Sequence, residues 1–189
     1  HSLFVIDHHK YQDIDRSFSV SSLEQFACLI SYHLNRWEMG IALNDRGYIP
    51  ALRKNGYSEE EILKIRQFDL ETQGYKPEHF DVLKKDYLKG YNSGKDLHVV
   101  ETNCEKTSYL SDLHFLENEK RKSRMDLVVF TVDSEKKIQE INFYGSPARA
   151  KALQKRFGGY SGGDDEVSMF WGNDMTTPMT KEEFLRFFN

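Results

Sequence analysis

MDLVVFTV, residues 125–132, is a strongly apolar run that is typical of a buried strand. The Asp133-Ser134 turn follows it, and Ser146-Pro147 then opens a helix, because proline at an early helical position loses no intrahelical hydrogen bond. Regular alternation of strands and helices around this run predicts a small α/β domain. The further predicted strands cover residues 97–101, 138–144 and 167–171, and the predicted helices cover residues 108–118 and 146–157.

The N-terminal half shows a different order of elements. Leu3 to Ile6 predicts a strand of a parallel sheet, since four consecutive apolar residues suit a strand buried on both faces. Ser21-Ser22 followed by Glu24 predicts a capped helix that runs to about Leu34. Further helices are predicted to start at Ser58 and at Pro77. Turn formers without periodicity at 90–94 predict a linker, so we expect domains over residues 1–90 and 91–189.

Composition limits the classes of protein that fit. The 189 residues are 39% hydrophobic and 13% aromatic, which is enough for a globular core, and the net charge of −4 argues against a generally basic nucleic-acid binder. Cys28 and Cys104 lack disulfide or metal spacing, which suits the reducing cytoplasm. No apolar run approaches the roughly 18 residues that a transmembrane helix requires, so we expect no membrane partner.

The triplet Asp7-His8-His9 is the first candidate site. Imidazoles can bind a divalent ion or donate to a phosphate, and a carboxylate can hold one ring in the required tautomer. Two adjacent histidines on a strand point in opposite directions, and one of them can simply be packed. The triplet follows an apolar run, and ligands of α/β sheets gather at the carboxyl ends of strands, which favours a functional interpretation.

Asp45 and the C-terminal glycine-rich segment are the other candidates. Asp45 follows a second apolar stretch and is predicted in a polar turn, either as a metal ligand beside His8 or as a surface residue. Glycines after a helix allow close approach to a phosphate and offer free backbone N–H groups, although glycine also commonly ends helices. Basic residues just before them provide positive charge or form a solvated helix face. The candidate substrate-binding residues are Arg149, Gly158, Gly159, Tyr160, Ser161, Gly162 and Gly163.

In this order, these motifs resemble those of DHH-family phosphoesterases. The resemblance rests on Asp7-His8-His9, the helix-capping Ser21-Ser22, the Asp45 segment and the glycine-rich loop. The family includes RecJ-like single-strand exonucleases, oligoribonucleases, cyclic-dinucleotide phosphodiesterases and a pyrophosphatase branch. The resemblance implies the end of a parallel-sheet DHH domain with flanking helices over 1–90, followed by a small α/β DHH-associated domain over 91–189.

The resemblance also implies roles for individual residues. His8 and Asp45 would be ligands in a two-metal site that holds Mn²⁺ or Mg²⁺. His9 would contact the scissile phosphate, and Asp7 would support the site. The histidine of the family's Gly-Gly-His loop is replaced here by Tyr160, which follows Gly158 and Gly159. A phenol can hydrogen-bond a phosphate or stack on a base but does not become cationic near neutral pH.

The resemblance implies further metal-binding motifs as well. Family members carry two earlier motifs that supply most ligands of the two ions, and neither has a place before Leu3. We therefore expect a missing N-terminal segment or a partner chain, or loss of the complete site, and little activity from the 189 residues alone. The expected substrate is a nucleotide phosphodiester or a short single-stranded nucleic acid. An oligomer is compatible with the sequence.

Two other functions remain open at this point. One is a non-catalytic module that binds nucleotides or regulates a partner through the glycine-rich domain. The other is an inorganic pyrophosphatase, which requires a basic cluster for its substrate, and the positive charges at residues 149–156 are compatible with one.

Overall fold

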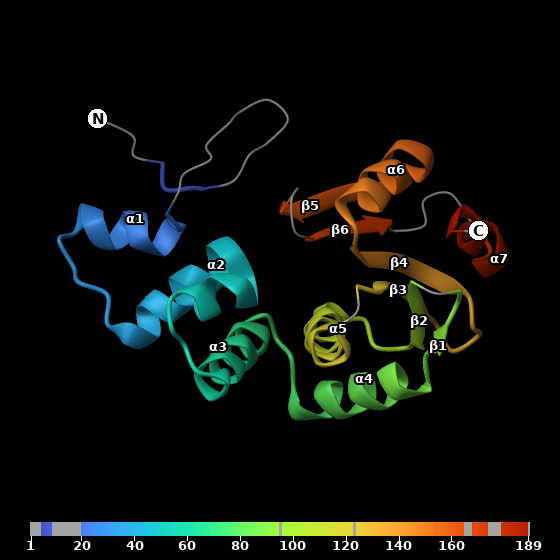
Figure 1. Ribbon diagram of the computed structural model, residues 1–189, viewed down its shortest axis with the longest axis horizontal. Coiled ribbons are helices and arrows are strands. Elements are labelled where there is room, and N and C mark those ends of the chain that lie inside the picture. The colour runs from blue at the N-terminus through green and yellow to red at the C-terminus, as the bar shows by residue number, and fades with distance from the viewer. Residues whose placement is uncertain are drawn as a thin grey trace. The chain divides into compact units, whose positions relative to one another are not determined.

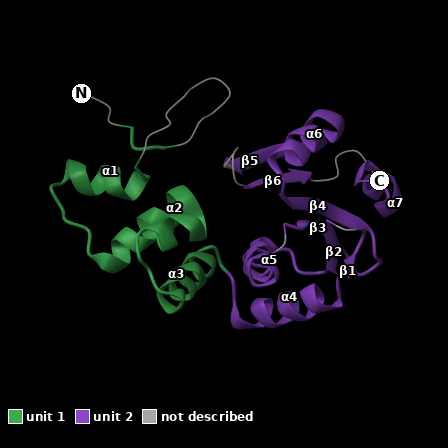
Figure 2. Cartoon of the chain, viewed as in Figure 1, with its two compact units in different colours: residues 1–74 green, residues 75–189 purple. Residues whose placement is uncertain are grey.

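The computed structural model describes residues 5–8, 20–94, 96–122, 124–164, 168–173 and 179–188. The chain forms two compact units, residues 1–74 and 75–189, which are described separately below (Figure 2). None of the helices in the described ranges combines the length and apolar character that a bilayer span demands.

The first unit is built from helices. Its described elements are α1 (Ser22–Leu29), α2 (Arg36–Lys54) and α3 (Glu59–Thr72), which are blue to blue-green in Figure 1. Capping boxes start all three helices, as serine or asparagine accepts from the backbone of a glutamate three residues later. Buried Gly40 permits the close packing of α2 on α3, because a Cβ atom there would lie 2.5 Å from Ile65 Cδ1. This packing places the middle of α2 against α3.

Two predictions for the first unit differ from the structure. The expected strand over Leu3 to Ile6 is wrong for its described part, since Val5 and Ile6 lie in irregular backbone and Val5 is 49% exposed. Leu3 and Phe4 lie outside the described residues. A strand needs a hydrogen-bonded neighbour, and the described residues of this unit provide none. The first helix also ends at Leu29 instead of Leu34, because Ser31 adopts a left-handed φ of 56°.

The second unit is an α/β unit built on a mixed sheet. In the described residues the sheet has six strands in the order β1-β2-β3-β4-β6-β5, with β2 and β3 parallel and the other neighbours antiparallel. The α/β class predicted for this region is confirmed. The strands are β1 (Tyr91–Asn92), β2 (Leu97–Thr102), β3 (Asp126–Val132), β4 (Ile138–Gly145), β5 (Tyr160–Asp164) and β6 (Ser168–Asn173).

Helices cover both faces of this sheet. The helices α4 (Pro77–Lys89) and α5 (Ser108–Arg121) lie on one side and α6 (Pro147–Phe157) lies on the other (Figure 1). All residues of the central strand β3 are buried, as expected for a strand that is covered on both faces. The chain ends in a short helix, α7 (Lys181–Leu185), followed by a single 3₁₀ turn (Arg186–Phe188), which the sequence analysis did not predict.

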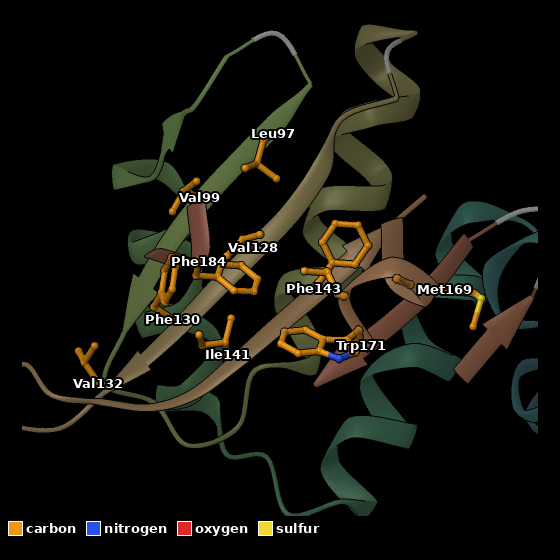
Figure 3. Close-up of a cluster of buried hydrophobic side chains, with 12 residues drawn as sticks. Leu97, Val99, Val128, Phe130, Val132, Ile141, Phe143, Met169, Trp171 and Phe184 are labelled. Atoms are coloured by element: carbon orange, nitrogen blue, oxygen red, sulfur yellow. The ribbon is translucent and has the colours of Figure 1, made fainter. Parts of the chain in front are cut away.

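The main core lies on the face of the sheet that carries α6 and α7. Alternate residues of the strands, such as Val128 and Phe130, point into this layer with Trp171 (Figure 3). The helices add Leu153 from α6 and Phe184 from α7. Trp171 and Phe184 stack with ring centroids 5.6 Å apart. These large buried side chains hold the C-terminal part of the chain on the sheet.

The division between the units differs from the predicted boundary after Gly90. It falls between Gly74 and Tyr75, because α4 packs against β2 and α5 and so belongs to the second unit. Tyr91 and Asn92 of the predicted linker form β1 and pair with β2.

Candidate functional site

His8 is held by the N-terminus of α1. Ser22, the first helical residue, donates its backbone N–H to His8 Nδ1 at 3.2 Å, and its hydroxyl oxygen lies 3.0 Å from the same nitrogen. Gln25 of the same helix donates to the carbonyl oxygen of Asp7 at 2.8 Å. Ser22 therefore holds the ring of His8, and Gln25 holds the backbone before it.

The two contacts with Ser22 define two tautomers of His8. Nδ1 has one in-plane position, which either accepts from the Ser22 N–H or donates to the Ser22 hydroxyl. In the first case Nε2 carries the proton. In the second case Nε2 presents a lone pair, which is the form that binds a metal ion. The serine can therefore support His8 in either state.

Asp45 lies opposite the other ring nitrogen of His8. Its Oδ2 is 3.6 Å from His8 Nε2, with the His8 side chain 10% exposed and that of Asp45 47% exposed. This separation is too long for a strong hydrogen bond. Metal–ligand bonds of about 2.0–2.2 Å place neighbouring ligand atoms about 3.0–3.5 Å apart, so the pair has nearly the spacing of two ligands of one ion.

The donor set supplies part of a coordination shell. An imidazole and a carboxylate suit Mn²⁺ or Mg²⁺, and such ions usually complete their shell with water and substrate phosphate oxygens. Across the described ranges of the chain, no three His, Cys, Asp or Glu side chains converge as a possible metal site. By their donor atoms and their spacing, His8 and Asp45 fit such an ion as two of its ligands.

The backbone that carries Asp45 is a helix, which corrects the predicted turn. Asp45 lies within α2, just before a kink at Tyr48, where φ is 56° and ψ is −155°. Polar residues favour a turn locally, but packing on α3 extends the helix through them. Buried Arg66 of α3 donates to Asn44 Oδ1 at 3.1 Å and stacks on the Tyr48 ring, with 4.6 Å from its Cζ to the ring centroid. Asp45 thus occupies a fixed place beside this kink.

Of the other two residues of the triplet, Asp7 belongs to the described part of the chain. Its carbonyl oxygen accepts from Gln25 as stated above. His9 lies outside the described residues. The structure therefore brings together His8 and Asp45 of the predicted catalytic and metal-binding set.

The predicted substrate-binding residues belong to the second unit. Arg149 Nη1 donates to Asp126 Oδ2 at 2.6 Å, and the other oxygen of this buried carboxylate accepts from the Ser146 N–H at 2.8 Å. The guanidinium of Arg149 is thus partly committed to holding α6 on β3. This ion pair was not foreseen from the sequence.

The glycine-rich segment is a turn followed by a strand, and the prediction of a loop over its whole length is wrong. Tyr160 to Asp164 form β5, an edge strand of the sheet that pairs with β6. Pairing engages backbone groups that the predicted anion nest would need. Tyr160 donates its hydroxyl to Glu140 at 3.0 Å, and Ser161 donates its hydroxyl to Gln154 at 2.7 Å.

Gly158 and Gly159 offer a matched test of this turn. Both have left-handed φ angles, 71° and 79°, but a Cβ atom on Gly159 would lie 2.2 Å from the Gly172 carbonyl oxygen while one on Gly158 would meet nothing within 4 Å. We expect Gly158→Ala to cost about 1–2 kcal/mol from backbone strain. Gly159→Ala should cost about 1–3 kcal/mol more, because the clash is with backbone. Urea denaturation measures both, and equal destabilisation would contradict the described turn.

A pocket that the sequence analysis missed lies between α4, α5 and β2. Its volume is about 200 Å³, and its walls include Tyr87, His98 and His114. His114 Nε2 donates to the Met125 carbonyl oxygen at 2.7 Å, and the Tyr87 hydroxyl donates to His114 Nδ1 at 3.0 Å. Burial lowers the pKa of His114 to about 4 and raises the pKa of Tyr87 to about 12. Since both ring nitrogens of His114 are bonded within the wall, we assign this ring a structural role.

No protein-family model matches the chain, and none of the curated proteins matches it in sequence. The motifs and the geometry of His8 and Asp45 are therefore the features of this chain that point to a function.

Proposed function

We propose that this protein is part of a metal-dependent phosphoesterase that hydrolyses a nucleotide phosphodiester or a short single-stranded oligonucleotide. The observation that carries the proposal is the separation of 3.6 Å between His8 Nε2 and Asp45 Oδ2. The resemblance of the motifs to DHH-family phosphoesterases gives these two residues a shared role as metal ligands. The order of Asp7-His8-His9, the capping serines and Asp45 along the chain supports the same role.

Each described residue has a task in this reaction. His8 and Asp45 would hold Mn²⁺ or Mg²⁺, and Ser22 would keep the Nε2 lone pair of His8 directed at Asp45 by accepting from Nδ1. A pair of such ions supplies, when bound, an activated water and charge stabilisation at the scissile phosphate. His9 would contact the phosphoryl oxygens, as the resemblance implies, and Asp7 would support the triplet.

The resemblance gives the second unit the task of binding substrate. Tyr160 can stack on a base, because its side chain is half exposed on the strand at the end of the sheet. Arg149 would contribute through guanidinium nitrogens other than Nη1, which bonds to Asp126. Gly158 would let substrate approach the backbone of the turn, because a Cβ atom there would meet nothing within 4 Å, whereas β6 fills the corresponding space beside Gly159, Gly162 and Gly163.

A nucleotide-binding module without catalysis is the second candidate. It is favoured by the finding that His8 and Asp45 form a pair and that no third metal-binding side chain joins them among the described residues. Such a module would bind the same nucleotides and leave them intact.

A substrate panel tests the proposal. The protein expressed from its complete gene is incubated with Mn²⁺ and bis-nitrophenyl phosphate, dinucleotides, cyclic dinucleotides, single-stranded DNA or pyrophosphate, with EDTA as the metal-free control. We expect hydrolysis of at least one phosphodiester with Mn²⁺ and none with EDTA. Nucleotide binding without hydrolysis would favour the binding module, and cleavage of pyrophosphate alone would favour a pyrophosphatase.

A further inference from the structure

Glu24 forms a link between the two helices that hold His8 and Asp45. Its carboxylate accepts from the Ser21 backbone N–H at 2.7 Å, which closes the capping box of α1. The same carboxylate oxygen lies 3.3 Å from Arg46 Nε on α2. The Glu24 side chain is 13% exposed, so solvent screens these interactions only in part.

Both ends of this link adjoin the candidate metal ligands. Ser22, which bonds to His8 Nδ1, lies between the capping-box residues Ser21 and Glu24, and Arg46 directly follows Asp45 in sequence. A shift of Glu24 would therefore move the helix start that orients His8 relative to the turn of α2 that carries Asp45.

The charge of Glu24 also affects the environment of a cation. Arg46 places a guanidinium next to Asp45, and an uncompensated positive charge there would disfavour a divalent ion at that carboxylate. Glu24 pairs with this guanidinium and so offsets its charge. The link thus acts on both the geometry and the electrostatics of the pair.

We propose that Glu24 is a positioning residue that sets the separation of His8 and Asp45 through its ion pair with Arg46. This inference rests on the proposed metal-binding role of His8 and Asp45. Residues that orient metal ligands in this indirect way typically change metal affinity by about 10–100-fold when they are replaced.

The chain contains a matched control for Glu24. Glu61 holds the same third position in the capping box of α3, and it also forms an ion pair with an arginine of α2, Arg36, at 2.6 Å. This second pair does not adjoin His8 or Asp45 in the described structure. Both variants lose a glutamate that closes a capping box and pairs with an arginine, but only the Glu24 variant loses the link to His8 and Asp45.

The test compares Glu24→Gln with Glu61→Gln. Glutamine can retain the capping hydrogen bond but loses the charge. Mn²⁺ affinity is measured by isothermal titration of the full protein. We expect Glu24→Gln to weaken Mn²⁺ binding by about 10–100-fold and Glu61→Gln to leave it unchanged. Wild-type affinity in Glu24→Gln would overturn the positioning role while leaving the proposed function intact.

Two further measurements keep the inference testable. The nitrogen-15 chemical shifts of the His8 ring, measured without metal, should change in Glu24→Gln and not in Glu61→Gln. This measurement does not require Mn²⁺ binding. Absence of Mn²⁺ binding in the wild-type protein would refute the proposed function and not the positioning role. Arg46→Gln removes the same pair from the other side. The double variant should lose no more affinity than either single variant, and additive losses would overturn the role of the pair.

Discussion

Replacement of His8 or Asp45 by alanine is expected to lower Mn²⁺-dependent phosphodiester hydrolysis by at least about 100-fold, since even partners that only orient metal ligands contribute about 10–100-fold. Each variant removes one of the two donors that lie 3.6 Å apart. Initial rates on the preferred substrate of the panel, measured at saturating Mn²⁺, provide the comparison.

The controls for these variants use residues of the same type elsewhere. His33 and Asp81 are exposed, so His33→Ala and Asp81→Ala should retain wild-type rates. Far-UV circular dichroism should be the same for all four variants, because neither His8 nor Asp45 belongs to the buried core. Wild-type rates in His8→Ala or Asp45→Ala would refute the assignment of the metal ligands.

Trp171→Ala should produce the largest loss of stability. Trp171 is fully buried in β6, stacks on Phe184, and donates its indole N–H to the Gly158 carbonyl oxygen at 2.8 Å. Removing a buried tryptophan leaves a large cavity and typically costs about 3–5 kcal/mol. Urea denaturation followed by far-UV circular dichroism measures the free energy of unfolding.

Two variants separate the causes of this loss. Trp171→Phe keeps an aromatic ring but loses the hydrogen bond to Gly158, which is worth about 0.5–1.5 kcal/mol, in addition to ring volume. Phe170 is the preceding residue of β6 and is 39% exposed, so Phe170→Ala should destabilise the unit much less than Trp171→Ala. A similar loss in Phe170→Ala and Trp171→Ala would contradict the packing of the sheet.

Much of the second unit could be predicted because its signals are local. The apolar run at 125–132 produced β3 (Asp126–Val132), and Pro147 marked the start of α6. Strand length and helix caps depend on neighbouring residues, so a single sequence reveals them. The capping boxes at Ser21 and Ser58 were predictable for the same reason.

The differences from prediction arise where distant residues decide the local conformation. Glycines 162 and 163 favour a loop by composition, but pairing with β6 makes them part of β5. The polar run around Asp45 resembles a turn, but contacts with α3, including those of Arg66, accompany a helix there. Such tertiary contacts override propensity and cannot be read from a local window.

The candidate site was predictable in part. The motifs suggested that Asp45 would lie near His8, and the structure places the two side chains beside each other. The link through Glu24 and Arg46 was missed because a capping glutamate and a surface arginine carry no sequence signal of their pairing. The ion pair of Arg149 with Asp126 was missed for the same reason.

Binding of Mn²⁺ tests the central claim most directly. Isothermal titration of the protein expressed from its complete gene should show saturable Mn²⁺ binding that weakens strongly in His8→Ala and in Asp45→Ala. Mn²⁺ binding that is identical in the wild-type protein and in both variants would contradict the assignment of His8 and Asp45 as metal ligands.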